Sequence, residues 1–571
     1  MKFIIAGKNI QVELNQSHFK AAGGEGQIFI KGQTVYKVCD PGKMIPEGKF
    51  KELSVLSHPR IIKPEEILLN TKKQPVGYTM RLVPNAIPLA QILTKIYRER
   101  EGVTLDVMLK LIQQMRDGIQ HVHDKGLLQV DGNEMNYMVT QDYNDVYFID
   151  VNSYETPHYP AEVLMLSIRD WHVETKGNRC IWTTMSDWFS FAVLSFYMFT
   201  GIHPYKGRHP NFTNMKTMMV DQMKANISVL DPQSIFPKAA AYPFDVIPNA
   251  YMQWFKAVLA EGKRLPPPKD FQAKIEFIAQ IKKVVGNNNF HIEELYDFAN
   301  YLTGFYSQNN QEVVITKDSI FYHRQKKEKP NKSIKIGYAP ITRTPIVAWI
   351  DDDLVKLKNL KTDMELPFSG GGNDLMSCGG RLYVKSEARI YEINFIESGS
   401  SHIMAAPKVV SDVMEHGTQL FQGLAIQNMF DGYFLSIFPE SGYCYQLKVP
   451  EFEKYRILEA KYESNVLMAI GIKDGQYDRF IMRFSKEYDS YDLRIIENVN
   501  FTGINFTVLD NGICISLTEE EKIEIFSCQK DSQSIKSIAD PVLEADMKLC
   551  HSDSQLMFAK GEKLYQISMK K

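Results

Sequence analysis

The loop Leu127-Leu-Gln-Val-Asp131-Gly-Asn-Glu-Met-Asn136 and the strand-like run Val146-Tyr-Phe-Ile-Asp150 that follows it decide how this chain folds. In the first stretch an aspartate and an asparagine stand five positions apart, and the second stretch is an apolar strand that ends in an acid. A carboxylate can accept the proton of a hydroxyl group, and carboxylate and amide oxygens are ligands of Mg²⁺. The two stretches together indicate an acidic site built on a loop.

A long helix is predicted directly before this loop. Apolar residues recur every three or four positions from Leu105 to Val122, which places them on one helical face. Thr104 is suited to cap the first turn of this helix. Other strands are expected at 27–30, 34–38 and 77–82, and other helices at 187–200 and 251–259. The first half of the chain is therefore expected to consist of a β-rich lobe followed by a helical lobe.

Glycines mark a hairpin near the N-terminus. The stretch Ala21-Ala-Gly-Gly-Glu-Gly-Gln-Ile28 joins two strand patterns, and glycine, which has no Cβ, lets backbone N–H groups approach a phosphate closely. Lys37 ends the next short apolar strand and is placed to reach a phosphate bound at the hairpin. Taken singly, these features also suit an ordinary hairpin and an ordinary strand lysine.

In this order the motifs resemble those of the protein kinase fold of the eukaryotic Ser/Thr type. Asp131 and Asn136 align with the D and N of H-R-D-x-x-x-x-N, and Asp150 aligns with the D of D-F-G. Lys37 aligns with the lysine of V-A-I-K, and the glycine hairpin aligns with G-x-G-x-x-G. The resemblance covers residues 18–268 and implies a bilobal, α+β kinase-like domain.

The resemblance implies a role for each matched residue. Catalytic roles fall to a strand lysine and two loop residues, namely Lys37, Asp131 and Asn133. ATP would be held by the hairpin, the strands behind it, a helical glutamate and the connection between the lobes, namely Gly23, Gly24, Gly26, Ile28, Lys37, Glu52, Met80 and Val83. Mg²⁺ would be held by Asn136 and Asp150. ATP and Mg²⁺ are therefore the implied cofactors.

The chain departs from the family pattern at several positions. Gln129-Val130 stands in place of the His-Arg of H-R-D, and Val151-Asn152 stands in place of the Phe-Gly of D-F-G. The loop has the form D-x-N-E-x-N, which resembles the atypical bacterial kinases known among the helix-hairpin-helix-containing kinases. In that group the asparagine and glutamate of the loop are typical residues.

Two charge pairs are expected from the same resemblance. The residue strictly aligned with the glutamate that pairs with the family's lysine is Lys49, so Glu52, one turn on, is preferred to Glu47. The alternative is that these three charges are simply solvated. Glu174 is expected to pair with Arg264, in the manner of a structural ion pair of the family.

The triplet Pro266-Pro-Pro268 ends the helical half, because prolines cannot continue a helix. We therefore predict a kinase-like domain at 1–268, with lobes at 1–83 and 84–268, and a second, all-β domain at 269–571. In the second domain, units of apolar strand, tight Asp/Gly/Asn turn and apolar strand recur with a period of about 40 residues. The repeat predicts a β-propeller of seven blades, or six to eight; the alternative is a pair of β-sandwiches or an irregular β domain.

Composition limits the classes of function. The chain of 571 residues has 66 Lys+Arg and 68 Asp+Glu, which gives a formal net charge of −2. A chain with so little net charge has no overall electrostatic attraction to nucleic acid or to an anionic membrane. No apolar run approaches the roughly 18 residues of a membrane-spanning helix. The seven cysteines are scattered and odd in number, which favours a reducing, cytoplasmic compartment.

Three functions are compatible with these patterns. The first is an ATP- and Mg-dependent protein kinase that phosphorylates Ser/Thr on a protein substrate, with the propeller binding a protein partner or regulating activity. The second is a pseudokinase scaffold that binds nucleotide without phosphoryl transfer, and the third is an unrelated β-rich adaptor. The presence of both Lys37 and Asp150 favours the kinase, because loss of catalysis usually removes the lysine or the metal-binding aspartate.

Overall fold

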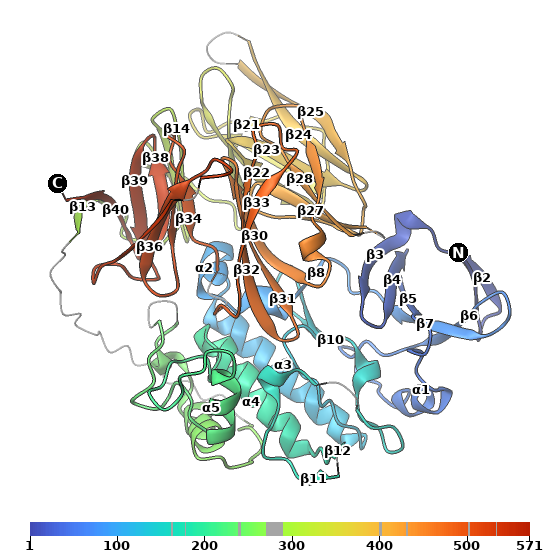
Figure 1. The fold of residues 1–571 in the computed structure, drawn as a ribbon. Helices are drawn as coiled ribbons and strands as arrows, with labels where there is room; N and C mark the ends of the chain where they lie inside the picture. The colour runs from blue at the N-terminus through green and yellow to red at the C-terminus, as the bar shows by residue number, and fades with distance from the viewer. Residues whose placement is uncertain are drawn as a thin grey trace.

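The structure is a computed structural model that describes residues 1–161, 164–177, 179–237, 241–269, 289–398, 402–429, 432–500, 503–532 and 534–570. Figure 1 shows three parts: a blue β-rich part that carries the N-terminus, a light blue to green helical part, and a region of β-sheets coloured yellow to red. In the described ranges no helix is both long and apolar enough to cross a membrane.

The β-rich part is one antiparallel sheet of seven strands, in the order β2-β1-β6-β7-β5-β4-β3. Its strands are β1 (Lys2–Ile5), β2 (Ile10–Glu13), β3 (Phe19–Gly23), β4 (Gly26–Lys31), β5 (Thr34–Cys39), β6 (Glu66–Leu69) and β7 (Pro75–Arg81), and the helix α1 (Glu47–Leu53) lies between β5 and β6. Phe19, Phe29 and Leu68 are fully buried in its core. The pairing of β4, β5 and β7 brings the glycine hairpin next to Lys37.

The helical part is built on two long helices that pack against each other. Its helices are α2 (Lys95–Glu101), α3 (Leu105–Asp124), α4 (Thr184–Thr200), α5 (Met218–Ala225), α6 (Asn249–Phe255) and the π-helical turn η7 (Lys256–Ala260). Its strands are β8 (Ala86–Pro88), β9 (Tyr137–Thr140), β10 (Val146–Phe148), β11 (Thr175–Lys176) and β12 (Arg179–Cys180). The 3-10 helices of the described residues are η1 (Gln16–His18), η2 (Leu89–Ile92), η3 (Val151–Ser153), η4 (Leu166–Ile168), η6 (Phe244–Val246) and η8 (Pro450–Phe452).

Local sequence explains where the two long helices begin and end. The predicted helix before the loop is confirmed as α3, with the Thr104 side chain accepting a hydrogen bond from the N–H of Val107. Helix α4 starts with a capping box between Thr183 and Ser186, and it ends at Gly201, which adopts the left-handed conformation. Whereas α3 is amphipathic, α4 is buried along almost its whole length and forms the centre of this part's core.

The described C-terminal region consists of seven four-stranded antiparallel sheets. The strands are β13 (Phe290–Asp297), β14 (Leu302–Gln308), β15 (Gln311–Thr316), β16 (Ser319–Tyr322), β17 (Gln325–Glu328), β18 (Ile334–Tyr338), β19 (Pro345–Asp351), β20 (Leu354–Asn359), β21 (Glu365–Leu366), β22 (Asp374–Cys378), β23 (Arg381–Ser386), β24 (Arg389–Ser398), β25 (His402–Asp412), β26 (Thr418–Leu420), β27 (Leu424–Met429), β28 (Gly432–Ile437), β29 (Tyr445–Lys448), β30 (Arg456–Glu463), β31 (Val466–Lys473), β32 (Gln476–Phe484), β33 (Tyr491–Ile496), β34 (Phe506–Val508), β35 (Ile513–Leu517), β36 (Lys522–Ser527), β37 (Ile535–Ala539), β38 (Lys548–Ser552), β39 (Gln555–Lys560) and β40 (Lys563–Met569).

Six of these sheets contain four consecutive strands, and the seventh has the order β13-β40-β39-β38. The first strand of the region therefore pairs with its last strand, from Phe290 opposite Met569 to Asp297 opposite Lys563. The all-β prediction for this region is confirmed, whereas the propeller stays a prediction. The predicted boundary at 268 lies between η7 and β13, next to residues 270–288, which are outside the described residues.

The halves of the chain are in contact at several points. Arg100 and Glu99 of α2 form ion pairs with Glu459 and Lys548 of the C-terminal sheets, at 3.1 Å and 2.9 Å. Helix α2 also lines one side of a cavity of about 1210 Å³ whose other sides are strands of several sheets. Strand β27 lies against β3 of the N-terminal sheet.

The ion pair expected between Arg264 and Glu174 is not formed, and this prediction is wrong. Nε and Nη2 of Arg264 instead donate to the two carboxylate oxygens of Asp170, both at 2.7 Å. Glu174 is exposed at the start of the β11–β12 hairpin, whereas Asp170 is buried beside α4, with the guanidinium 4.5 Å from the Phe189 ring centre. The hairpin turns Glu174 to solvent, so Asp170 pairs with the partly buried arginine instead.

We predict that Asp170→Ala lowers the free energy of unfolding by about 3 kcal/mol, because it leaves Arg264 partly buried without its carboxylate. Glu174→Ala is the matched control and should change that free energy by less than about 0.5 kcal/mol. Urea unfolding of the full chain, followed by tryptophan fluorescence, measures both values. Equal losses for the two variants would contradict the assignment of Asp170 as the partner of Arg264.

Candidate active site

Lys37 on β5 is the centre of the first group of candidate residues. Its side chain is buried, and its Nζ donates to Glu25 Oε2 at 2.6 Å and to Asp150 Oδ1 and Asn152 Oδ1 at 3.4 Å each. Burial alone would lower the pKa of Lys37, but the acidic groups around it, Tyr78, Asp150 and Glu25, outweigh burial and raise the pKa. Lys37 is therefore a permanent cation at this point.

The glycine hairpin places a carboxylate on this cation. Glu25 stands at the tip between β3 and β4, and its Oε2 also accepts a hydrogen bond from Asn152 Nδ2 at 3.1 Å. Burial would raise the pKa of Glu25, but the hydrogen bond from Lys37 is the main reason that the pKa lies below its usual value. The Glu25 carboxylate is thus bound to the Lys37 ammonium group at the position where the sequence predicts a phosphate.

The hairpin glycines differ in what they require. Gly26 has a φ of +146°, and a Cβ there would lie 2.2 Å from the carbonyl oxygen of Val38, so the backbone admits only glycine. Gly23 and Gly24 are exposed, and nothing lies within 4 Å of a Cβ built on either residue. Ile28, half-buried on β4, is the direct strand partner of Lys37. The hairpin is therefore fixed at Gly26 and open at its tip.

Asp150 enters the site from the end of β10. Its backbone is in the left-handed conformation, with φ 56° and ψ 35°, and its carbonyl oxygen accepts hydrogen bonds from Ser153. The N–H of Phe148, two residues earlier, donates to the carbonyl oxygen of Arg60 at 2.8 Å. Strand β10 is thereby tied to the segment that follows α1, two residues before Asp150.

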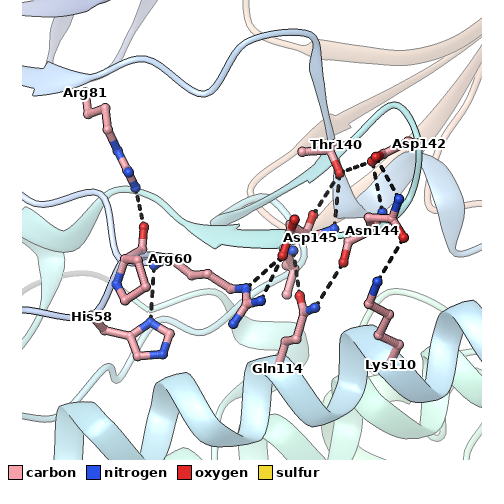
Figure 2. Close-up of polar contacts among 11 residues, drawn as sticks. His58, Arg60, Arg81, Lys110, Gln114, Thr140, Asp142, Asn144 and Asp145 are labelled. Atoms are coloured by element: carbon pink, nitrogen blue, oxygen red, sulfur yellow. Dashed lines mark hydrogen bonds and ion pairs between the residues drawn. The ribbon is translucent and has the colours of Figure 1, made fainter.

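A polar network holds the start of β10, at the opposite end of the strand from Asp150 (Figure 2). Nε and Nη2 of Arg60 donate to Asp145 Oδ1 at 3.0 Å and 2.8 Å. Gln114 of α3 donates to the carbonyl oxygen of Asn144 and accepts from the N–H of Val146, both at 3.0 Å. The network therefore joins the segment after α1, the β9–β10 hairpin and α3 into one support for β10.

Asp131 lies on the loop between α3 and β9 and is 9% exposed. Its Oδ1 accepts a hydrogen bond from the N–H of Met165 at 2.9 Å, and its Oδ2 accepts one from Asn136 Nδ2 at 3.2 Å. Burial is the main cause that raises the pKa of Asp131 above its usual value. Asn133 is buried, and its Oδ1 accepts from the N–H of Met135 at 2.8 Å, so it holds the turn of the loop.

The predicted magnesium ligands are brought together by the backbone. The N–H of Ile149, next to Asp150, donates to the carbonyl oxygen of Asn136 at 2.9 Å. Mg²⁺ sites commonly take one or two protein oxygens and complete the octahedron with phosphate and water. The described residues contain no cluster of three or more His, Cys, Asp or Glu that could hold a metal by themselves. Asn136 and Asp150 therefore stay predicted ligands of a metal ion that would arrive with a phosphate.

The backbone before Asp131 is strained and held by one buried acid. Val130 has a φ of 60°, which is costly for a β-branched residue, and the N–H of Asp131 donates across it to the carbonyl oxygen of Gln129 at 2.7 Å. The carboxylate of Asp187, in the first turn of α4, accepts the N–H groups of Gln129 and Val130 at 2.8 Å each and contacts His123 Nε2 at 2.9 Å. Asp187 therefore sets the conformation of the loop.

Glu52 does not pair with Lys37 in the structure. Its Oε1 is 2.6 Å from Nδ1 of His158, and α1 carries its side chain toward that segment and away from β5. Glu25 pairs with Lys37 instead, and Asn152 completes the group. Sequence reasoning missed both residues; the available signals were an acid at the tip of the glycine hairpin and an amide where the family pattern has glycine.

The two residues expected to contact adenine lie at the edge of the N-terminal sheet. Met80 is on β7, half-buried and paired with Val35, and Val83 is half-buried just after that strand. The N–H of Leu82 donates to the carbonyl oxygen of Gln33 at 3.1 Å, which keeps the chain beside the sheet as it leaves for the helical part. Both residues stay candidates for a base-binding edge.

Comparisons with known proteins add little to this geometry. No protein-family model matches the chain, and no curated protein matches it. Among solved structures, the chain is similar to the Cydia pomonella granulovirus kinase PK-1, with 12% identity over 43% of this chain and 88% of that chain and a TM-score of 0.32. A likeness that weak carries no argument, so the suggestion of a kinase-like fold rests on the arrangement of Lys37, Asp131, Asn136 and Asp150.

We predict that Asp187→Asn lowers the free energy of unfolding by about 3 kcal/mol, because the amide cannot accept from both backbone N–H groups and leaves a buried donor unpaired. Asp221→Asn is the matched control: this acid also lies in the first turn of a helix, α5, but bonds only the Thr217 hydroxyl at a solvent-facing position. Its effect should stay within about 0.5 kcal/mol. Denaturant unfolding measures the free energy of unfolding of both variants. A loss in Asp221→Asn as large as the loss in Asp187→Asn would contradict the role given to Asp187.

Proposed function

We propose that this protein is an ATP- and Mg-dependent protein kinase that transfers phosphate to a Ser or Thr hydroxyl of a protein substrate. The observation that carries the proposal is the approach of Lys37 Nζ to Asp150 Oδ1 at 3.4 Å. A buried cation from the β-rich part and an acid from the helical part meet there. Asp131 and Asn136 lie on the loop that precedes β9. Few side chains are needed, because phosphoryl transfer is mainly positioning and charge neutralisation.

Each residue then has a defined task. Lys37 and the hairpin Gly23–Gly26 bind the phosphates, and Asn136 and Asp150 hold Mg²⁺, which neutralises the charge that develops during transfer. Asp131 orients the substrate hydroxyl and takes its proton as that oxygen bonds to the γ-phosphorus and the bond to ADP breaks. Asn133 holds the turn that carries Asp131.

Nucleotide binding requires an exchange of partners at Lys37. A phosphate must replace the Glu25 carboxylate on Nζ, because two anions so close together repel each other. The backbone movement that this exchange needs costs little free energy, because Glu25 stands beside the exposed Gly24 at the open tip of the hairpin. Glu25 thus keeps the buried lysine paired until a phosphate arrives.

A second candidate function is a pseudokinase scaffold that binds nucleotide without phosphoryl transfer. The observation that favours it is that both carboxylate oxygens of Asp131 already accept hydrogen bonds, from Met165 and Asn136. A hydroxyl substrate would have to share or displace one of them. Lys37 and Asp150 are used in the same way in both functions, so only turnover separates them.

For the C-terminal region we propose a seven-bladed β-propeller that binds a protein partner. Support comes from the seven four-stranded sheets and from the pairing of β13 with β40, which is how a ring of blades is closed. The proposal places the protein in the bacterial cytoplasm with no nucleic-acid or membrane partner. The seven cysteines, all free thiols, are compatible with a reducing compartment.

We predict that Mg–ATP raises the melting temperature of the full chain and that Lys37→Ala removes this increase, since a ligand stabilises only the state that binds it. Lys31→Ala is the matched control, because Lys31 ends the neighbouring strand, is exposed and bonds only a backbone oxygen. Differential scanning fluorimetry with and without Mg–ATP measures the shift. No shift in the wild type, or an unchanged shift in Lys37→Ala, would contradict nucleotide binding at this lysine.

We predict that Asp131→Asn keeps the Mg–ATP shift but lowers phosphoryl transfer by a factor of about 10²–10⁴. In the wild type, kcat should rise with pH as the carboxyl group loses its proton, with a midpoint above that of an ordinary aspartate because burial raises the pKa of Asp131. Autophosphorylation with labelled ATP across a pH series measures this rise. Asp142→Asn, in the exposed turn after β9, should leave the profile unchanged; equal turnover by Asp131→Asn would favour the scaffold.

A further inference from the structure

The C-terminal region reaches the loop that carries Asp131. The hydroxyl of Tyr477, on β32, donates a hydrogen bond to Oε1 of Glu134, and the two residues are 3% and 4% exposed. Glu134 stands between Asp131 and Asn136 in the loop. A side chain that is 343 positions away in the sequence therefore contacts the centre of the candidate site.

The surroundings of this contact preserve the hydrogen bond. Burial raises the pKa of Tyr477 well above its usual value, so the hydroxyl stays protonated and remains a donor at neutral pH. Lys206 of the helical part lies over the Tyr477 ring, 5.0 Å from its centre, and donates to the carbonyl oxygen of Val499 at 2.8 Å. The hydrogen bond is thus enclosed between the two halves.

A second contact from the same sheet acts on Asp131 itself. The β31–β32 turn has Asp474 at φ 51° and Gly475 at φ 74°, and a Cβ on Gly475 would lie 2.5 Å from Cγ of Met165. The N–H of Met165 is the group that donates to Asp131 Oδ1 at 2.9 Å. The hairpin turn therefore packs against the residue that restrains the Asp131 carboxylate.

A third contact passes through η2. Gln91 donates its Nε2 hydrogen to the carbonyl oxygen of Leu458 on β30 at 2.9 Å, and the N–H of Ala90 donates to the carbonyl oxygen of Glu134 at 3.2 Å. Ala90 is fully buried in an apolar cluster that includes Leu458 and Tyr477. Three separate routes therefore connect the sheet β30–β33 to the loop.

We infer that the sheet β30–β33 is part of the catalytic apparatus and that Tyr477 is a positioning residue for the loop 131–136. The inference rests on the proposed kinase function. The loop has no helix or strand of its own and follows the strained Val130, so its conformation depends on contacts from outside it. Phosphoryl transfer needs the acid placed to within a fraction of an ångström, which Tyr477 supports by holding Glu134.

The test uses the full chain with Tyr477→Phe, which removes the hydroxyl and keeps the ring. The kcat for ATP-dependent autophosphorylation should fall about tenfold, as expected for a lost buried hydrogen bond to an ionisable group, while the KM for ATP stays within about twofold. The nucleotide is expected to be held by Lys37 and the hairpin, which Tyr477 does not restrain. Backbone amides of 131–136 should exchange hydrogen faster than in the wild type.

Tyr491→Phe is the matched control, because it removes a hydroxyl that donates to Glu451 at 2.7 Å within the C-terminal region. It lies in the same sheet and should change neither kcat nor exchange at 131–136. Equal kcat and equal exchange for the two variants would overturn the role of Tyr477. A wild type that neither binds nor turns over Mg–ATP would instead overturn the proposed kinase function, and the exchange comparison would still decide whether Tyr477 holds the loop.

Discussion

The candidate site depends on one buried carboxylate. Asp187 accepts the N–H groups of Gln129 and Val130 and contacts His123, and without these bonds the left-handed conformation of Val130 would be too costly to keep. The loop that follows would then lose the direction that brings Asp131 next to Asn136. Asp187 can do this because α4 is buried along almost its whole length and is held by packing on all sides. A buried, apolar helix thus supports a polar loop.

At the other end of the site the controlling factor is charge balance. A buried lysine is stable only when paired, and Lys37 is paired with Glu25 and Asp150, which come from the glycine hairpin and from β10. The strand β10 that leads to Asp150 is held at its start by the network around Arg60 and Asp145 (Figure 2). Under the function proposed above, a phosphate-bearing ligand would replace Glu25 on Lys37 without leaving the cation unpaired.

The C-terminal sheets are more than an appended module. They contact α2 through Glu459 and Lys548, and they contact the Asp131 loop through Tyr477 and its neighbour Met165 through Gly475. The two ion pairs and the Tyr477–Glu134 hydrogen bond have definite directions, so they specify one relative arrangement of the two halves more strictly than apolar packing would.

The sequence by itself determined the features that depend on local spacing. Helical periodicity and Thr104 predicted α3, because periodicity and capping act over short stretches. The order of Lys37, Asp131 and Asp150 predicted which segments would meet only through the resemblance to a known family. Recurring strand–turn–strand units predicted an all-β second region, and their arrangement as a propeller stays a prediction.

Only the tertiary structure decided which charged groups became partners. Glu25 rather than Glu52 pairs with Lys37, Asp170 rather than Glu174 pairs with Arg264, and Tyr477 contacts Glu134. Each of these choices depends on where a side chain points after distant elements have packed. No spacing along the chain records that direction, since a change of one helical turn or one hairpin orientation moves a carboxylate from the protein interior into solvent.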